Sequence, residues 1–224
     1  MSELRPPANR LYAIVDTGLF GLEPEAVTGA VRTLLDCGAR WIQLRAKGLP
    51  DLAAWRLAEA VGPMFEETSG VDGEGDAPLL WINDSAAAAS ALAASGSSTG
   101  LHLGQDDLPP AVARQSVPPA CPIGRSTHSR EQAAEADADR AVDALAIGPV
   151  FGTTTKDRPD PVVGLAGVAE ARAVTSKPLI AIGGIDADRA PRVIEAGADV
   201  VAVISAFEPH RLAASCRDLL RALR

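Results

Sequence analysis

Cysteine and aromatic residues are scarce in this sequence. Its three cysteines, Cys37, Cys121 and Cys216, lie far apart and form neither a Cys-x-x-Cys pair nor a Cys/His spacing. This excludes a disulfide framework and a cysteine-based zinc site, and it predicts small buried thiols in a reducing compartment. Aromatic residues make up 4% of the chain beside 20 glycines, which favours close packing of helices against strands.

Long hydrophobic runs are also missing, and acidic residues outnumber basic ones. No run approaches the roughly 18 apolar residues that span a bilayer, and residues 1–10 are polar, with no apolar signal-peptide core. The net charge is −8, which disfavours a nucleic-acid or anionic-membrane partner but not a small anionic substrate. We therefore expect a cytoplasmic protein, whose partners are small-molecule substrates and whose state as a homo-oligomer is left open.

Hydrophobic residues make up 47% of the chain and recur as alternating strand-like and helix-like segments. Such alternation predicts parallel strands, and a count of eight favours a closed (β/α)8 TIM barrel over an open doubly wound sheet. We predict one domain over 1–224, with an N-terminal extension at 1–10, an exposed loop at 66–77 and a long loop at 152–163. The expected strands are 11–15, 39–44, 78–82, 100–103, 122–124, 141–147, 178–182 and 200–204. The expected helices are 23–35, 50–65, 84–94, 108–115, 126–137, 165–174, 186–196 and 210–223.

Charged residues follow three of the expected strands. Arg45 and Lys47 follow the second strand, Asp84 the third, and Asp107 the fourth. In a barrel these strand ends share one mouth, where the active site lies. Strands often end in polar loop residues, so each ending alone says little, and a ring of structural salt bridges is an alternative. Cations, including Lys156, together with two carboxylates nevertheless suit a diphosphate bound with Mg²⁺.

The last two expected strands end in a pattern typical of phosphate sites. The seventh runs into Gly183 and Gly184, and the eighth into Ile204 and Ser205. Glycines let backbone N–H groups approach an anion closely, and barrels often hold a phosphate at these two strand ends. A plain turn is the alternative. A monophosphate on one side and a metal–diphosphate on the other suggest group transfer from a diphosphate to a phosphorylated acceptor.

The three histidines have different expected roles. His102 lies on the fourth expected strand, where it faces a substrate ring or is satisfied in the core. His128 follows a Ser-Thr pair and orients a loop or takes part in chemistry. His210 precedes the last helix and is expected at the surface.

Seven short segments, in order along nearly the whole chain, resemble the thiamine-phosphate synthase family. They are Gln-Leu-Arg-Ala-Lys (43–47), Ile-Asn-Asp (82–84), His-Leu-Gly-Gln-Asp-Asp (102–107), Ser-Thr-His (126–128), Gly-Pro-Val-Phe with Thr-Thr-Thr-Lys (148–156), Ala-Ile-Gly-Gly-Ile (181–185) and Val-Ile-Ser-Ala (203–206). The resemblance implies a transferase of thiamine biosynthesis. It would join 4-amino-5-hydroxymethyl-2-methylpyrimidine diphosphate to a thiazole phosphate by a dissociative, Mg²⁺-assisted route, giving thiamine phosphate and diphosphate.

The resemblance also implies a role for individual residues. Gln43 would contact the pyrimidine, with His102 beside the substrate, and Asp84 and Asp107 would bind Mg²⁺. The diphosphate would be held by Arg45, Lys47, Asn83, Ser126 and Lys156, of which Arg45, Lys47, Ser126 and Lys156 would be catalytic. The thiazole phosphate would be bound by Thr153, Thr155, Gly184, Ile204 and Ser205.

Two alternatives remain open beside the transferase. A related thiazole tautomerase keeps the barrel and the thiazole-phosphate site but uses a histidine at the position of His128 and lacks the paired metal carboxylates. A barrel that binds a thiamine precursor without turnover is the second alternative.

Overall fold

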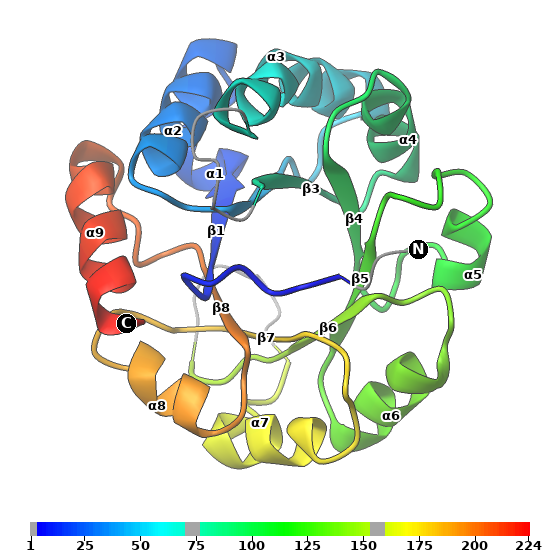
Figure 1. Cartoon of the computed structure of the whole chain (residues 1–224), viewed down its shortest axis with the longest axis vertical. Helices are drawn as coiled ribbons and strands as arrows, with labels where there is room; N and C mark the ends of the chain where they lie inside the picture. Colours follow the sequence, from blue (N-terminus) through cyan, green and yellow to red (C-terminus); the bar gives the residue numbers. More distant parts are fainter. Residues whose placement is uncertain (1–3, 70–76, 153–159) are drawn as a thin grey trace.

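Eight parallel strands close into one barrel, in which each strand pairs with the next and β8 pairs with β1 (Figure 1). The structure is a computed structural model that describes residues 4–69, 77–152 and 160–224. The strands are β1 Leu11–Asp16, β2 Trp41–Arg45, β3 Leu79–Asn83, β4 Thr99–Leu103, β5 Ile123–Thr127, β6 Ala144–Ile147, β7 Leu179–Ile182 and β8 Val200–Val203. The predicted (β/α)8 barrel is confirmed, and the open sheet is wrong.

Helices surround the barrel in chain order (Figure 1). They are α1 Thr17–Phe20, α2 Pro24–Asp36, α3 Asp51–Ser69, α4 Ala86–Ala94, α5 Pro110–Ala113, α6 Arg130–Ala138, α7 Gly164–Arg172, α8 Ala190–Glu195, the 3₁₀ helix η1 Pro209–Arg211 and α9 Leu212–Ala222. The short helix α1 was not predicted. It begins where Asp16 caps it, because Oδ1 of Asp16 accepts a hydrogen bond from the N–H of Gly18 at 2.8 Å.

Two predicted boundaries are wrong for identifiable reasons. The loop predicted at 66–77 begins too early, because α3 continues to Ser69, with Thr68 bonded to the carbonyl of Met64. Residues 70–76 lie outside the described part of the chain. The helix predicted from Ser126 begins only at Arg130, because β5 pairs with β6 through Thr127 and Ser129 supplies the cap.

The inside of the barrel is aromatic on one half and aliphatic on the other. Tyr12, Trp41 and Trp81 fill the side of β1 to β3, with the rings of Trp41 and Trp81 5.2 Å apart. Small and branched residues fill the opposite side: Ala144, Ala146, Ile180, Val200 and Ala202. Leu4, from the segment that crosses the barrel before β1 (Figure 1), packs against this interior cluster.

Two glycines let the large interior rings approach their neighbouring strands. A Cβ at Gly100 on β4 would lie 2.7 Å from Cε3 of Trp81, and one at Gly124 on β5 would lie 2.8 Å from Nδ1 of His102. Since real Cβ atoms do not approach so closely, both positions require glycine. The aromatic half of the barrel therefore depends on the small residues of β4 and β5.

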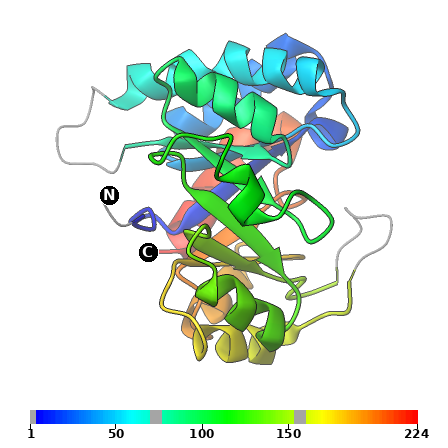
Figure 2. The same cartoon turned by 90° about the vertical axis from the view of Figure 1, so that its right-hand side faces the viewer.

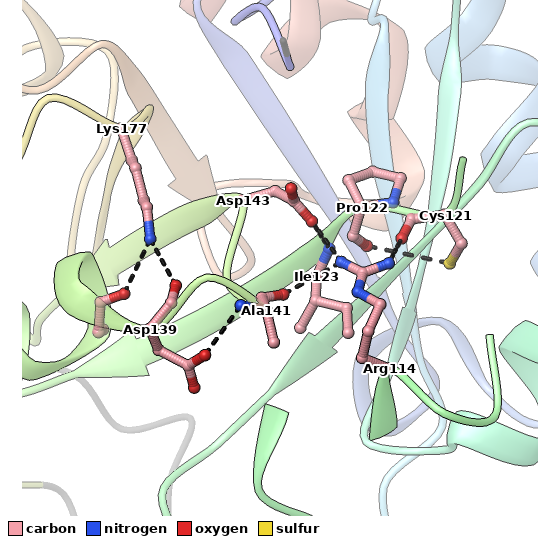
Figure 3. A network of polar contacts seen from close by, with 9 residues as sticks. Arg114, Cys121, Pro122, Ile123, Asp139, Ala141, Asp143 and Lys177 are labelled. Carbon is pink, nitrogen blue, oxygen red and sulfur yellow. Dashed lines mark hydrogen bonds and ion pairs between the residues drawn. The ribbon is translucent and has the colours of Figure 1, made fainter. Parts of the chain in front are cut away.

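Two equivalent carboxylate clamps tie strands together at the N-terminal end of the barrel. Asp143, just before β6, accepts hydrogen bonds from the N–H of Ile123 at 2.8 Å and from Arg114 at 2.5 Å (Figure 3). Asp199, just before β8, does the same for Leu179 and Arg172, each at 2.8 Å. Both arginines also donate to backbone carbonyls. These clamps therefore stabilise the fold at the end of the barrel that lies away from the active-site face.

We expect Asp143→Ala to lower the free energy of unfolding by about 1–3 kcal/mol, because a backbone N–H and a guanidinium lose their acceptor. Asp218→Ala is the matched control. Its ion pair with Arg221 is 2.8 Å long and exposed, so its loss should cost under about 0.5 kcal/mol. Urea unfolding followed by circular dichroism measures both, and equal losses would contradict the assigned role of the clamp.

The outer core lies between the strands and the helices and contains the cysteines. Cys121 and Cys216 are buried, Cys37 is half-buried, and all three are free thiols. The prediction of small buried thiols therefore holds for two of them in full. Trp55 on α3 is partly buried and packs against this core. Across residues 4–69, 77–152 and 160–224, no helix is long and apolar enough to cross a membrane.

Candidate active site at the barrel mouth

A cavity of about 1070 Å³ opens at the C-terminal ends of the strands. This is the end opposite to the clamps, on the right-hand side of Figure 2. Eleven of the site residues predicted from the sequence line it: Gln43, Arg45, Lys47, Asn83, Asp84, His102, Asp107, Ser126, Gly184, Ile204 and Ser205. The other three, Thr153, Thr155 and Lys156, lie outside the described residues. The volume exceeds that of a typical pocket for one small ligand.

Strand register explains why these side chains share one cavity. Successive residues of a strand alternate between the inside and the outside of a barrel. Gln43 follows Trp41 on the inside of β2, and Ser126 follows Gly124 on the inside of β5. His102 pairs in register with Asn83. The inward positions are thus apolar near the N-terminal end and polar near the mouth.

Asp84 and Asp107 form a close pair of carboxyl groups at the ends of β3 and β4. Asp84 has a left-handed backbone (φ 63°), and its N–H donates to the carbonyl of His102 at 2.9 Å. Burial, a hydrogen bond with Asp107 and the charge of Asp107 raise the pKa of Asp84 from 3.8 to about 7, while Lys47 and Arg45 oppose the rise. Two carboxylates held this close favour a bound cation between them.

The loop after β4 fixes the position of the second carboxylate. Oδ2 of Asp107 accepts a hydrogen bond from the N–H of Gly104 at 2.6 Å, and Arg125 donates to the Gly104 carbonyl at 2.6 Å. Asp106, its neighbour, is exposed and forms no hydrogen bond or ion pair with the described residues. Arg125 was not identified from the sequence, because its partners are carbonyl groups that carry no sequence signal.

The two carboxylates fit a magnesium ion but do not enclose one. Mg²⁺ is usually held by one or two carboxylates, with water and substrate phosphate completing six oxygen ligands. In the described part of the chain, no group of three or more His, Cys, Asp or Glu side chains is placed to hold a metal. A metal bound at Asp84 and Asp107 would therefore take its remaining ligands from water and a phosphorylated substrate.

The two cations of the β2 end differ in their surroundings. Arg45 is largely buried and forms a short ion pair with Asp16, which also caps α1. Lys47 is exposed at the rim and lines the same cavity. Asp16 thus fixes the guanidinium, which leaves its remaining N–H groups for an anion, while the lysine ammonium is free to move. The Asp16–Arg45 pair could not be recognised from sequence spacing.

The floor of the cavity is polar and closely hydrogen-bonded. Nε2 of Gln43 donates to the hydroxyl of Tyr12 at 2.8 Å, and burial raises the pKa of that hydroxyl. Nε2 of His102 lies 3.0 Å from Oγ of Ser126. The amide of Gln43 is thereby oriented, with its oxygen available to a ligand. His102 is buried and also lies on the cavity wall.

The opposite side of the mouth carries the glycine pair after β7. Gly183 and Gly184 both have positive φ, 108° and 60°. A Cβ at Gly183 would lie 2.6 Å from Cα of Pro149, and one at Gly184 would lie 2.5 Å from the carbonyl oxygen of Gly152. The turn therefore packs directly on the backbone that follows β6. Together with Ile204 and Ser205 after β8, it forms the concave backbone surface expected of an anion site.

We expect Gly184→Ala to weaken phosphate binding about 10-fold or more and to destabilise the protein by about 1–3 kcal/mol, since both backbone strain and a collision result. Gly29→Ala on α2 is the control, because a Cβ there meets nothing within 4 Å. It should leave binding unchanged and stabilise the helix slightly. Titration calorimetry with inorganic phosphate and thermal unfolding test both expectations. Unchanged phosphate affinity in Gly184→Ala would remove this turn from the site.

His128 links two loops at the mouth. Its Nδ1 lies 2.6 Å from the carbonyl oxygen of Gly148, so this nitrogen carries a proton. Its Nε2 lies 3.5 Å from a carboxylate oxygen of Asp160, and its backbone N–H donates to Gln132. The hydrogen bond of Nδ1 to Gly148 fixes the ring between the two loops, which supports the loop-orienting role. His210 is exposed beside Glu208.

A closed (β/α)8 barrel with paired carboxylates, cations and a backbone anion turn around one mouth belongs to the class of barrels suited to phosphorylated small molecules. Over residues 11–207 the sequence matches the family described as thiamine monophosphate synthase. The chain belongs to this family of enzymes.

Individual relatives agree with this assignment. The chain is 42% identical over 202 residues to the thiamine-phosphate synthase of Koribacter versatilis (strain Ellin345), covering 88% of this chain and 87% of the relative. It is 40% identical over 173 residues to that of Chlorobium phaeovibrioides (strain DSM 265 / 1930), covering 77% of each. Among solved structures, the thiamine phosphate pyrophosphorylase from Pyrococcus furiosus has a TM-score of 0.79 at 30% identity, covering 96% of this chain and 95% of the other.

Proposed function

We propose that this protein joins 4-amino-5-hydroxymethyl-2-methylpyrimidine diphosphate to a thiazole phosphate, releasing thiamine phosphate and diphosphate. The observation that carries the proposal is the convergence of two carboxylates, two cations and a backbone anion turn on one cavity, in a member of the thiamine monophosphate synthase family. One half of the cavity suits a metal–diphosphate, and the other suits a monophosphate.

In this proposal the reaction begins with loss of the diphosphate. The bond between the pyrimidine methylene carbon and the bridging oxygen breaks, and its electron pair leaves with the diphosphate. Arg45, Lys47, Asn83 and Ser126 bind the leaving group and stabilise its growing negative charge. Mg²⁺ held by Asp84 and Asp107 would supply further charge neutralisation. The amide of Gln43, oriented by Tyr12, contacts the pyrimidine.

The second step forms the carbon–nitrogen bond. The thiazole nitrogen donates its lone pair to the pyrimidine methylene cation, which gives the thiazolium ring without any proton transfer. The turn at Gly183 and Gly184, with Ile204 and Ser205, holds the thiazole phosphate and so positions the nitrogen. This chemistry needs no general base, so the charged groups of the cavity serve to bind and stabilise the leaving diphosphate.

The carboxylate pair, and not His128, separates the synthase from the tautomerase alternative. The hydrogen bond of Nδ1 of His128 to Gly148 leaves Nε2 unprotonated in the neutral ring, so His128 keeps the nitrogen that a general base needs. The carboxylate pair at Asp84 and Asp107, however, has no use in an isomerisation of a thiazole phosphate. The synthase reaction uses this pair, so we favour it.

An assay with each substrate alone and both together, with and without Mg²⁺, tests the proposed function. Diphosphate release that requires both substrates and the metal supports the synthase. Hydrogen exchange on the thiazole phosphate alone would indicate the tautomerase. Tight binding of the thiazole phosphate with neither reaction would indicate the non-catalytic binder.

We expect Lys156→Ala to lower turnover much more than stability, by about 10- to 100-fold, since a charged hydrogen bond to the leaving group is lost. Lys156 lies outside the described residues, so this expectation comes from the sequence motif alone. Lys177→Ala is the control: its ammonium bonds to backbone carbonyls at the opposite end of the barrel (Figure 3). Steady-state kinetics should show the loss in Lys156→Ala alone, and an unchanged rate there would remove Lys156 from the site.

A further inference from the structure

The surroundings of His102 determine which of its two ring nitrogens carries the proton, and therefore which way the hydrogen bond between His102 and Ser126 runs. His102 stands inside the barrel on β4, with its ring 6.2 Å from that of Tyr12 and 6.3 Å from that of Trp81. Its Nε2 is 3.0 Å from Oγ of Ser126 on the neighbouring strand β5. Its Nδ1 is fully buried and has no hydrogen-bond partner among the described residues.

The imidazole can exist in three protonation states, and the surroundings select one. A doubly protonated ring would carry a buried N–H at Nδ1 without an acceptor, because Nδ1 has no hydrogen-bond partner among the described residues. Protonation at Nδ1 alone would bury an N–H without an acceptor, which is rare in folded proteins and costly. Protonation at Nε2 alone leaves Nδ1 with an unshared lone pair, which costs less.

Gly124 supports the same choice from the other side of the ring. The direction in which Gly124 would carry a Cβ ends 2.8 Å from Nδ1 of His102. Gly124 therefore packs against this side of the ring. Its Cα–H group cannot accept a hydrogen bond, so a proton on Nδ1 would find no partner there, whereas a bare Nδ1 lone pair needs none. His102 is thus protonated at Nε2 and donates to Ser126.

This direction of donation determines what Ser126 presents to the cavity. A serine hydroxyl has one hydrogen and two lone pairs. Because Oγ accepts from His102, its own hydrogen points elsewhere, and Oγ has no other hydrogen-bond partner among the described residues. Ser126 lines the cavity with Lys47 and Asp107. With the opposite tautomer, the serine would donate to His102 and show only lone pairs to a ligand, which would repel an anion.

We propose that His102 is a positioning residue that holds the hydroxyl of Ser126 as a hydrogen-bond donor for the anion bound in this cavity. That the anion is a diphosphate rests on the proposed function, whereas the direction of the hydrogen bond does not. His102 acts through Ser126. The imidazole remains neutral while the anion binds and leaves.

The first test reads the tautomer directly in the unaltered protein. The two nitrogens of a neutral imidazole differ widely in ¹⁵N chemical shift, depending on which one carries the proton. The chain has three histidines, and the spectrum of His102→Gln identifies the missing signal. We expect His102 to be neutral and protonated at Nε2 at pH 7, with and without inorganic diphosphate and Mg²⁺. A His102 protonated at Nδ1 would overturn the proposal.

The second test measures whether His102 acts through Ser126. Affinity for inorganic diphosphate with Mg²⁺ is compared by calorimetry in Ser126→Ala, His102→Leu and the double variant. We expect each single change to weaken binding about 10-fold or more, and the double variant to be no weaker than Ser126→Ala. His102→Gln, whose amide N–H reaches as far as Nε2, should recover most of the affinity. Additive losses would overturn the proposal.

A matched control separates positioning from folding. Thr99→Val removes a buried hydroxyl at the other end of β4, where Oγ1 of Thr99 donates to the carbonyl of Ser97 at 3.1 Å. It should lower the unfolding temperature without changing diphosphate affinity. If the wild-type protein binds diphosphate with this coupling but forms no thiamine phosphate, the proposed function fails and the role of His102 stands.

Discussion

Asp107→Asn should abolish Mg²⁺-dependent turnover, with a loss of at least about 100-fold, while binding of a thiazole phosphate survives. In the proposed function, the metal would lose one of its two protein carboxylates, and the leaving diphosphate would lose charge compensation worth several kcal/mol. The asparagine Oδ1 still accepts from the N–H of Gly104, a contact that is 2.6 Å long in the structure. The loop after β4 therefore stays in place, and the change tests charge alone.

Two further variants complete this experiment. Asp107→Ala removes both the charge and the contact with Gly104, so it should lose activity and some stability. Asp106→Asn changes the exposed neighbouring carboxylate and should leave turnover within about twofold. Calorimetry with the thiazole phosphate, in parallel with steady-state kinetics over a range of Mg²⁺ concentrations, distinguishes these results. If Asp107→Asn loses thiazole-phosphate binding as well as turnover, Asp107 has a structural role instead.

The sequence predicted the fold and eleven of the residues that line the cavity, because both depend on periodicity. Strand ends in a parallel barrel meet at one mouth, so residues at the ends of predicted strands converge whatever the details of packing. Gln43, Asp84, Asp107 and Ser126 line one cavity for this reason. Ser126 was predicted to begin a helix but lies on β5. It lines the cavity all the same, because a shift of a few residues at a strand end leaves a residue near the mouth.

Contacts between side chain and backbone could not be predicted in this way. Arg125 binds the carbonyls of Gly104 and Gln105, and His128 binds that of Gly148. A carbonyl group occurs at every residue, so no residue type or spacing marks these partners. The left-handed backbone of Asp84 was equally hidden, because aspartate adopts that conformation only where the surrounding chain requires it. These contacts position the site residues rather than bind ligands.

Asp84→Asn should remove activity and yet stabilise the metal-free protein. The pKa of Asp84 is raised from 3.8 to about 7 by burial and by its hydrogen bond and repulsion with Asp107. A raised carboxyl pKa means that the folded state binds the proton more tightly than the unfolded state does. This contribution to stability is complete below about pH 4 and is lost as the pH rises through about 7. At pH 8 the wild-type protein therefore contains two repelling carboxylates.

Asparagine at position 84 removes this repulsion and suits the left-handed backbone at least as well as aspartate. We expect the free energy of unfolding at pH 8 without metal to rise by about 1–2 kcal/mol, below the full linkage value because Asp84 is partly exposed to solvent. Between pH 5 and pH 8 the stability of the variant should also fall less than that of the wild type. Asp106→Asn should match the wild type throughout.

Magnesium should reverse the order of stability. In the proposed function, the ion binds the folded wild-type protein and should stabilise it in proportion to the logarithm of its concentration, whereas Asp84→Asn would lack one of the two carboxylate ligands. The two unfolding temperatures should therefore cross as Mg²⁺ is added at pH 8, and this crossing is measured by thermal unfolding across a magnesium series. A metal-free Asp84→Asn protein less stable than the wild type at pH 8 would show that the carboxyl pair supports the fold. That result would contradict the view that the two carboxylates lower the stability of the metal-free protein and are present to bind a metal.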